Sequence, residues 1–157
     1  MPQQAILDTL LDELELYEEL LETLHVQQEQ LSGRESKGLE QSAEIIVSLV
    51  TETRDNRKVR SQLLADLELE NTPEGMDIYL SELPASRQVE ATETWEELVE
   101  LVAECKAVNQ VNGQLLNIQQ QMTENLLQRL DIQNTHPAYS SDGHQKKEHS
   151  ALYQTST

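Results

Sequence analysis

The sequence predicts an all-α fold, namely an antiparallel bundle of long helices with coiled-coil-like packing and a polar C-terminal tail. Phenylalanine is absent and aromatic residues make up 3% of the 157 residues, so the core must consist mainly of leucine and valine. Leucine-rich cores with few aromatic residues suit helix-on-helix packing better than a sheet. Apolar residues also recur at alternating steps of three and four, the period of a helix, between short polar breaks.

The first helix is expected over residues 4–31. Leucines beside its main apolar seam, such as Leu11, Leu16 and Leu20, favour a multi-helix bundle over a two-stranded coil. Apart from His25, the ionisable side chains are acids and one tyrosine. The seam follows a heptad pattern that is broken at Gln28 and consists of Leu7, Leu10, Leu14, Tyr17, Leu21, Leu24 and Leu31.

A second helix is expected over residues 39–68, after the glycine-containing break "SGRESKG". Its middle, "TETRDNRKVR", is polar and carries a cluster of basic residues, which are Arg54, Arg57, Lys58 and Arg60. Two interpretations are open: these side chains pair with the acidic first helix across the bundle, or they form a basic docking patch. The apolar face consists of Leu39, Ala43, Ile46, Val50, Leu63, Leu64 and Leu67.

A short helix is expected near 75–83 and a long one over 90–130. Thr72 followed by Pro73 is a good helix N-terminus, because proline at the first helical position loses no hydrogen bond that is needed. The long helix would span roughly 60 Å at 1.5 Å per residue. Either Ser86, after Pro84, or Thr94, in a capping box with Glu97, could cap it.

Composition changes after Asp131, which divides the chain into a helical bundle domain at 1–131 and a tail at 132–157. The tail is polar and punctuated by proline, glycine and serine, so we expect it to be flexible unless bound. The chain has 11 Lys and Arg against 29 Asp and Glu, a net charge of -18. Such a charge repels nucleic acid and anionic lipid, which are therefore not expected partners.

A cytoplasmic location is expected from the sequence. No apolar run approaches the ~18 residues needed to span a bilayer, so membrane insertion is not expected. The N-terminus lacks the basic region of a signal peptide, and Cys105 has no second cysteine for an internal disulfide.

Catalytic chemistry is not expected either. The glycines are scattered rather than gathered in a phosphate-binding loop, and Cys105 shares a helix face with Val102, which indicates a core position. His136, His144 and His149 lie in the tail, where a metal site would lack fixed geometry. No set of nucleophile, base and oxyanion donors is apparent, so we predict a protein that is not an enzyme and has no cofactor or metal.

The stretch "NQVNG" at 109–113 is unusual within a predicted helix, because glycine costs roughly 1 kcal/mol relative to alanine there and asparagine is also unfavourable. At these residues the seam of the long helix turns polar. It reads Trp95, Leu98, Val102, Cys105, Asn109, Asn112, Leu116, Gln119, Thr123, Leu126 and Leu130. A second ridge begins beside it, formed by Val108, Val111, Leu115, Ile118 and Met122.

Two interpretations of the asparagines are open. In one, the core shifts to the second ridge and Asn109 and Asn112 face water. In the other, both lie in the seam and fix its register through hydrogen bonds to a neighbouring helix, while Gly113 lets another backbone come close. Either way, the helix carries more apolar surface than one neighbour covers, and the first two helices are too short to cover it. Such a ridge is typical of a site for an amphipathic partner helix.

The sequence resembles the FlgN family of flagellar export chaperones over most of its length, most strongly from Trp95 onward. The matching motifs, in chain order, are "R-x-x-L-L-x-x-L" at 60–67, "Y-L-x-x-L" at 79–83, "W-x-x-L" at 95–98, "N-x-x-N-G-x-L-L" at 109–116, "L-x-x-L" at 127–130 and "Y-x-x-D-G" at 139–143. The tail after Gly143, "HQKKEHSALYQTST", departs from the family pattern of small and basic residues.

This resemblance implies a cytosolic chaperone that binds hook-associated proteins, the proteins of the hook–filament junction. It would keep them unassembled and deliver them to the flagellar type III export gate. In the family, cargo binding belongs to the C-terminal part, which implies a cargo groove formed by Leu115, Ile118, Met122 and Leu126. Tyr139 would dock the loaded chaperone on the export gate; alternatively it packs back onto the bundle or serves as a spacer.

Two other classes of protein fit parts of the pattern. A structural coiled-coil adaptor without an export role explains the heptads equally well, but not the ordered "N-x-x-N-G" and "Y-x-x-D-G" motifs. A four-helix enzyme or metal carrier needs inward carboxylates and histidines on the same helices, whereas His25 is the one histidine in a predicted helix.

Overall fold

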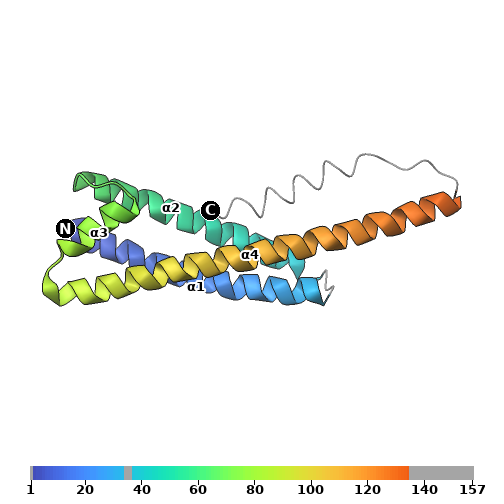
Figure 1. The fold of residues 1–157 in the computed structure, drawn as a ribbon, viewed down its shortest axis with the longest axis horizontal. Coiled ribbons are helices and arrows are strands. Elements are labelled where there is room, and N and C mark those ends of the chain that lie inside the picture. Colours follow the sequence, from blue (N-terminus) through green and yellow to red (C-terminus); the bar gives the residue numbers. More distant parts are fainter. Residues whose placement is uncertain (1, 34–36, 135–157) are drawn as a thin grey trace.

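The computed structural model describes residues 2–33 and 37–134, and within these ranges it contains four helices and no strand. They are α1 (Pro2–Ser32), α2 (Leu39–Asp66), α3 (Pro73–Ser81) and α4 (Ala85–Asn134), as Figure 1 shows. The predicted all-α fold is confirmed. Residues 135–157 lie outside the described ranges, and with them lie Tyr139 and the three histidines of the tail.

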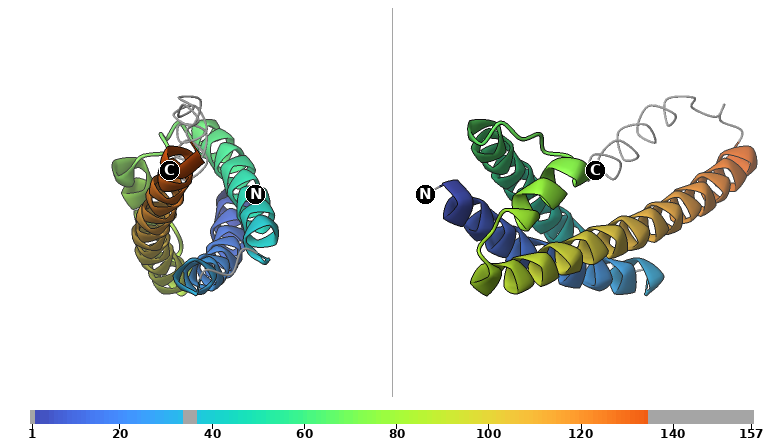
Figure 2. Two further views of the ribbon diagram at one scale, coloured as in Figure 1. Left: turned by 90° about the vertical axis from the view of Figure 1, so that its right-hand side faces the viewer. Right: turned by 60° about the vertical axis from the view of Figure 1, so that its left-hand side comes forward.

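The long helix α1 lies between α2 and α4, and the two neighbours run in opposite directions along it (Figures 1 and 2). Ser42, early in α2, donates to Gln30, late in α1, at 2.9 Å, so these two helices are antiparallel. Asn112 of α4 donates to the carbonyl of Leu24 at 2.9 Å. Donors further along α4 reach carbonyls further along α1, so α1 and α4 are parallel.

The short helix α3 closes one end of the bundle against the start of α1. As expected, Pro73 is its first residue, and the Thr72 hydroxyl caps it by accepting a hydrogen bond from the backbone N–H of Gly75 at 3.1 Å. Tyr79 is buried, and its hydroxyl donates to the carbonyl of Gln3 at 2.7 Å. The core of the bundle includes Ile6, Leu10, Leu20, Leu24, Ile46, Leu49, Leu64, Met76, Leu80, Ala91, Leu98 and Cys105.

The helix α4 is longer at both ends than the sequence indicates. It begins directly after Pro84, whose carbonyl accepts hydrogen bonds from the N–H groups of Arg87 and Gln88 at 2.9 and 3.0 Å. Neither predicted cap is correct: Ser86 lies inside the helix, which begins at Ala85, and Thr94 is buried further along it with its hydroxyl donating to the carbonyl of Glu90 at 2.8 Å. At the other end α4 continues past the predicted limit to Asn134.

An ion pair between Glu13 and Arg60 joins α1 to α2 inside the bundle, with side chains only 2% and 4% exposed. The Arg60 guanidinium also lies over the Trp95 ring, 5.6 Å from its centroid. Burial lowers the pKa of Arg60 to about 10, which leaves it charged at neutral pH. The predicted pairing of the basic cluster with the first helix is therefore confirmed for Arg60.

Candidate partner-binding surface

Side chains of α4 reach main-chain carbonyls of α1 at a repeat of seven residues. Each contact joins residues separated by 88 positions in sequence, so the two helices keep one register over two heptads. The donors and their carbonyls are Cys105 with Tyr17, at 3.6 Å, Asn112 with Leu24, at 2.9 Å, and Gln119 with Leu31.

Asn112 is the central contact of this register. Its side chain is fully buried, and besides Leu24 it donates to the amide oxygen of Gln27 at 3.0 Å. Asn109 is buried as well. The interpretation in which the asparagines face water is therefore wrong, because α1 covers this side of α4. Buried amides that bond to a neighbouring helix favour a single register, since a shift would break the bonds that the Asn112 amide nitrogen donates to Leu24 and Gln27.

Within the described residues, no second backbone approaches the glycine of the same motif. A Cβ atom built on Gly113 would meet no atom within 4 Å, because α1 packs on the Asn112 side of α4 instead. A close approach at Gly113 by the backbone of a partner stays a prediction.

The register also determines where α1 stops covering α4. Gln119 lies beside Leu31, and α1 ends at Ser32, whereas α4 continues for about 15 further residues, roughly 22 Å at 1.5 Å per residue. Figure 1 shows this end of α4 extending past α1 and α2. Seam residues beyond this point, such as Thr123, Leu126 and Leu130, are exposed.

The residues predicted to bind cargo lie where this cover is lost. Leu115 is partly buried, whereas Ile118, Met122 and Leu126 are 53%, 48% and 61% exposed. We call these four residues the α4 patch. The exposed Leu127 and Leu130 add apolar surface to the same end of the helix. Because the second ridge is not buried, it does not replace the seam as the core of the bundle.

The helix around the α4 patch is unusual in charge for this chain. No charged residue occurs from Ala107 to Thr123, although charged residues make up 25% of the sequence. A stretch of exposed apolar side chains without charge is typical of a surface that contacts another protein. The geometry suits an amphipathic helix laid along α4.

The family model of the FlgN protein matches residues 1–147 of this chain. The chain belongs to the FlgN family. This membership gives it a general role as a flagellar export chaperone.

One solved structure has a similar fold. It is described as a flagella synthesis protein, FlgN, from Pseudomonas aeruginosa, and it matches with a TM-score of 0.65 at 24% sequence identity. The match covers 71% of this chain and 85% of that chain. At this identity the likeness supports the helical fold alone. No curated protein matches the chain in sequence.

Other groups in this FlgN chain are arranged for structure. Burial, with a smaller effect of the Glu104 charge, raises the pKa of the Cys105 thiol to about 12, so the thiol stays protonated at neutral pH. Among the described residues, no group of three His, Cys, Asp or Glu side chains could hold a metal ion. Within the same ranges, no helix is long and apolar enough to cross a membrane.

Two buried polar residues of α1 were missed by the sequence pattern. Glu13 and Gln27 are 2% and 0% exposed and occupy seam positions that face Arg60 and Asn112. A signal for them exists in the sequence, because they complete a regular alternation of three and four. That alternation is Ile6, Leu10, Glu13, Tyr17, Leu20, Leu24, Gln27 and Leu31.

Proposed function

We propose that this member of the FlgN family binds hook-associated proteins in the cytoplasm, keeps them unassembled and delivers them to the flagellar type III export gate. The observation that carries the proposal is the end of α4, where Met122 and Leu126 are exposed beyond the last contact with α1, at Gln119, and Ile118 is exposed just before it. An exposed apolar surface of this kind favours a chaperone over a coiled-coil adaptor, whose apolar seam is already covered by its neighbouring helices.

The cargo suits this surface. Hook-associated proteins have terminal segments that become coiled-coil helices on assembly, and before export these segments present apolar stripes. A stripe of this kind laid on the α4 patch would be covered and could not associate with a second copy of the cargo. Each large apolar side chain that becomes fully buried contributes about 1.5–3 kcal/mol, less here because the patch is only half exposed beforehand.

The charge pattern supports the same role. The net charge of -18 keeps a complex with apolar cargo soluble. The uncharged stretch from Ala107 to Thr123 leaves the contact region without the repulsion that an acidic helix would impose on an acidic partner. Apolar contact therefore dominates binding at the patch.

Delivery requires a second contact, and we assign it to Tyr139, which lies outside the described residues. Tyrosine brings a large contact area and one hydroxyl for a hydrogen bond. On this proposal Tyr139 contacts the export gate while the α4 patch holds the cargo, so docking and cargo binding use different residues.

The experiment is co-purification of the tagged full-length chain from flagellated cells, followed by identification of the bound proteins. The proposal predicts recovery of hook-associated proteins. Recovery of none of them would favour the structural adaptor. The variant Ile118→Asp with Met122→Asp, made in the same strain, tests whether recovery depends on the α4 patch.

A further inference from the structure

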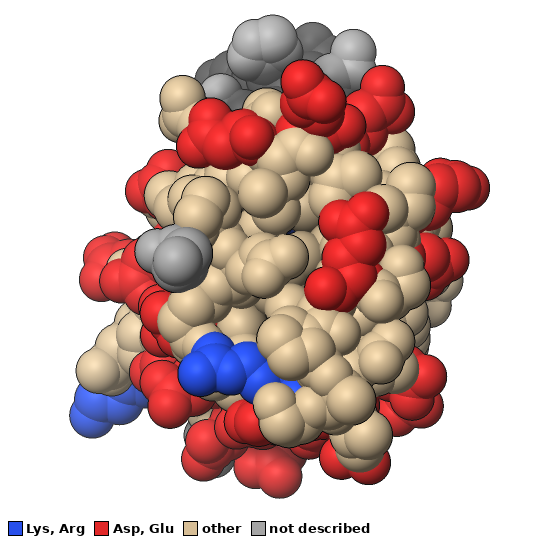
Figure 3. Space-filling view, turned by 90° about the vertical axis from the view of Figure 1, so that its left-hand side faces the viewer, with Lys and Arg blue, Asp and Glu red and all other residues tan. Residues whose placement is uncertain are grey.

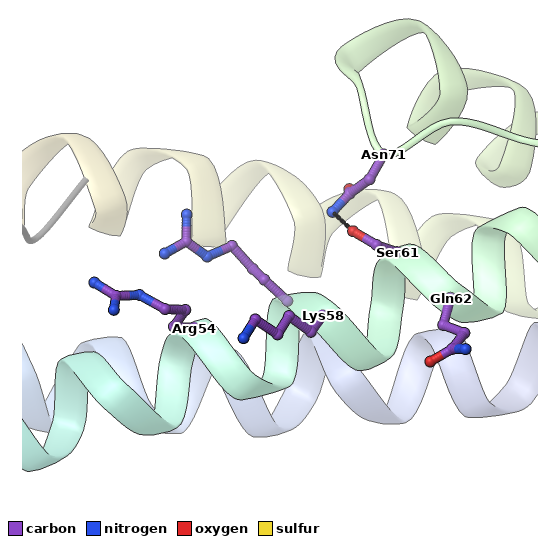
Figure 4. Close-up of a pocket in the computed structure, with 6 residues that line it drawn as sticks. Arg54, Lys58, Ser61, Gln62 and Asn71 are labelled. Carbon is purple, nitrogen blue, oxygen red and sulfur yellow. Dashed lines mark hydrogen bonds between the residues drawn. The ribbon is translucent and has the colours of Figure 1, made fainter.

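An open hollow of about 680 Å³ lies on α2 and the loop that leads to α3 (Figure 4). Its walls consist of Arg54, Arg57, Lys58, Ser61, Gln62 and Asn71. The residues of α2 recur at helical spacing, so they lie on one face of the helix. Three of the chain's 11 basic residues thus line one hollow in a protein with a net charge of -18.

The end of the bundle where α3 lies is acidic. Figure 3 shows the end of the bundle where α3 lies, and there acidic side chains are spread over the face while basic ones are few. Isolated basic residues on such a surface would improve solubility little. Three basic residues in one hollow instead produce a local positive region. A ligand senses this region within about 10 Å, the distance over which charges act at ordinary salt.

The far wall of the hollow is held in place by the end of α2. Asn71 donates to the Ser61 hydroxyl at 2.8 Å, which ties the loop to the helix. The backbone supports this contact, because Glu68 adopts a left-handed conformation, with φ 61, and the N–H of Leu69 donates to the carbonyl of Leu64 at 2.8 Å. The loop therefore turns back over α2 and brings Asn71 to the basic residues.

The lining specifies the chemistry of a ligand. It offers two guanidinium groups, an ammonium group, a hydroxyl and two amides, and it has no aliphatic or aromatic side chain. Guanidinium groups bind carboxylates through paired hydrogen bonds. Sites for small molecules are mostly apolar and enclose the ligand, and sites for nucleic acid bases offer aromatic rings, whereas this hollow is open and polar.

We propose that the hollow on α2 docks a short acidic segment of a protein partner, whose carboxylates contact Arg54, Arg57 and Lys58. A long polyanion or an anionic membrane would meet the repulsion of the whole acidic chain. A few carboxylates on an otherwise neutral or basic protein meet mainly the local positive region. This site is separate from the α4 patch, since it lies on α2 and the loop to α3, towards the other end of the bundle (Figure 1).

The test uses the full chain and a fluorescein-labelled peptide that carries three glutamates among glycine and serine residues, with binding followed by fluorescence anisotropy at about 0.1 M salt, where charges act over about 10 Å. The wild type binds saturably, and binding weakens as salt is added. The double variant Arg54→Gln with Lys58→Gln binds about tenfold more weakly, a difference of about 1.4 kcal/mol. Both residues are exposed on α2, so helix content and thermal midpoint remain those of the wild type.

The matched control is Arg87→Gln with Lys106→Gln, which makes the same change in net charge at exposed sites on α4. It should bind the peptide as the wild type does, and so should Ile118→Asp with Met122→Asp. The proposal is overturned if the wild type shows no saturable binding, or if the control loses as much affinity as the α2 variant. Tighter binding of labelled single-stranded RNA or of anionic vesicles than of this peptide would also overturn it.

Discussion

The side-chain amide of Asn112 donates a hydrogen bond to the main-chain carbonyl of Leu24, at 2.9 Å, within a fully buried contact between α4 and α1. Because the same offset recurs one heptad later, where Gln119 contacts Leu31, this bond helps determine how far α4 extends past the end of α1. The register of the bundle thereby determines how much of the α4 patch is exposed to a partner.

Asn112→Ala should lower the free energy of unfolding by about 1–3 kcal/mol, because it leaves the buried amide of Gln27 without this partner. The loss is measured as a shift in the urea midpoint with an unchanged slope. Asn117→Ala, at an exposed site on the same helix, is the control and should be neutral or slightly stabilising, since alanine is the better helix former. Equal losses in both variants would contradict a special role for Asn112.

The ion pair between Glu13 and Arg60 predicts a strongly non-additive response to substitution. Glu13→Ala leaves the Arg60 charge buried without its partner, and we expect a loss of about 3–5 kcal/mol in the free energy of unfolding. The double variant Glu13→Leu with Arg60→Met removes both charges and should be more stable than Glu13→Ala. Chemical denaturation of the wild type, Glu13→Leu, Arg60→Met and the double variant measures the coupling, and additive losses would show that the pair contributes no mutual stabilisation.

The raised pKa of Cys105 predicts a loss of stability in alkaline solution. The thiol has a pKa of about 12 in the folded chain against its ordinary value of 9.0, so the folded state keeps a proton that the unfolded state releases. Its contribution is complete below pH 9 and falls as the pH rises towards 12. Burial likewise raises the pKa of Tyr79 to about 12, but from 10.0, so its effect begins at higher pH.

Between pH 9 and pH 10 the effect of Tyr79 is small, but Arg60, with a folded-state pKa of about 10, begins to lose its proton, so the comparison with Cys105→Ala is what isolates the thiol. Urea midpoints of the wild type should fall across this window, and those of Cys105→Ala should change less. A parallel decline in both proteins would indicate that another group is responsible.

Tyr139→Ala should leave cargo affinity nearly unchanged but reduce export of hook-associated proteins, and with it motility. The reason is that the proposed docking residue lies outside the cargo-binding patch. Swimming assays and a binding assay between the loaded complex and the isolated gate component measure the two effects. Loss of cargo binding in a purified two-component assay, or wild-type motility, would show that Tyr139 does not dock the chaperone.

Local patterns in the sequence were sufficient for much of the fold. The apolar period and the polar breaks place α1, α2 and α3 within a few residues of their observed limits, and Thr72 with Pro73 marks the start of α3. These features depend on the residues of one segment, such as a capping hydroxyl or a proline, and can therefore be read from that segment.

Features that depend on two segments were harder to predict. Glu13 and Gln27 are polar, so a pattern of apolar residues does not include them in the seam. Each is stable in the core only because it has a partner on another helix. The position of Gly113 faces open space rather than a second backbone, since the direction from which α1 approaches was not readable from α4 alone. Exposure of the seam residues Leu126 and Leu130 likewise depends on the register between α1 and α4, which places them beyond the end of α1.

The most direct test of the central claim is the affinity of the purified chain for a hook-associated protein, measured by titration calorimetry for the wild type and for Ile118→Asp with Met122→Asp. Both side chains are about half exposed, so circular dichroism should show unchanged helix content. The account predicts that the double variant binds at least about 100-fold more weakly, a difference of about 2.7 kcal/mol. Wild-type affinity in a folded double variant would contradict the assignment of the α4 patch as the cargo site.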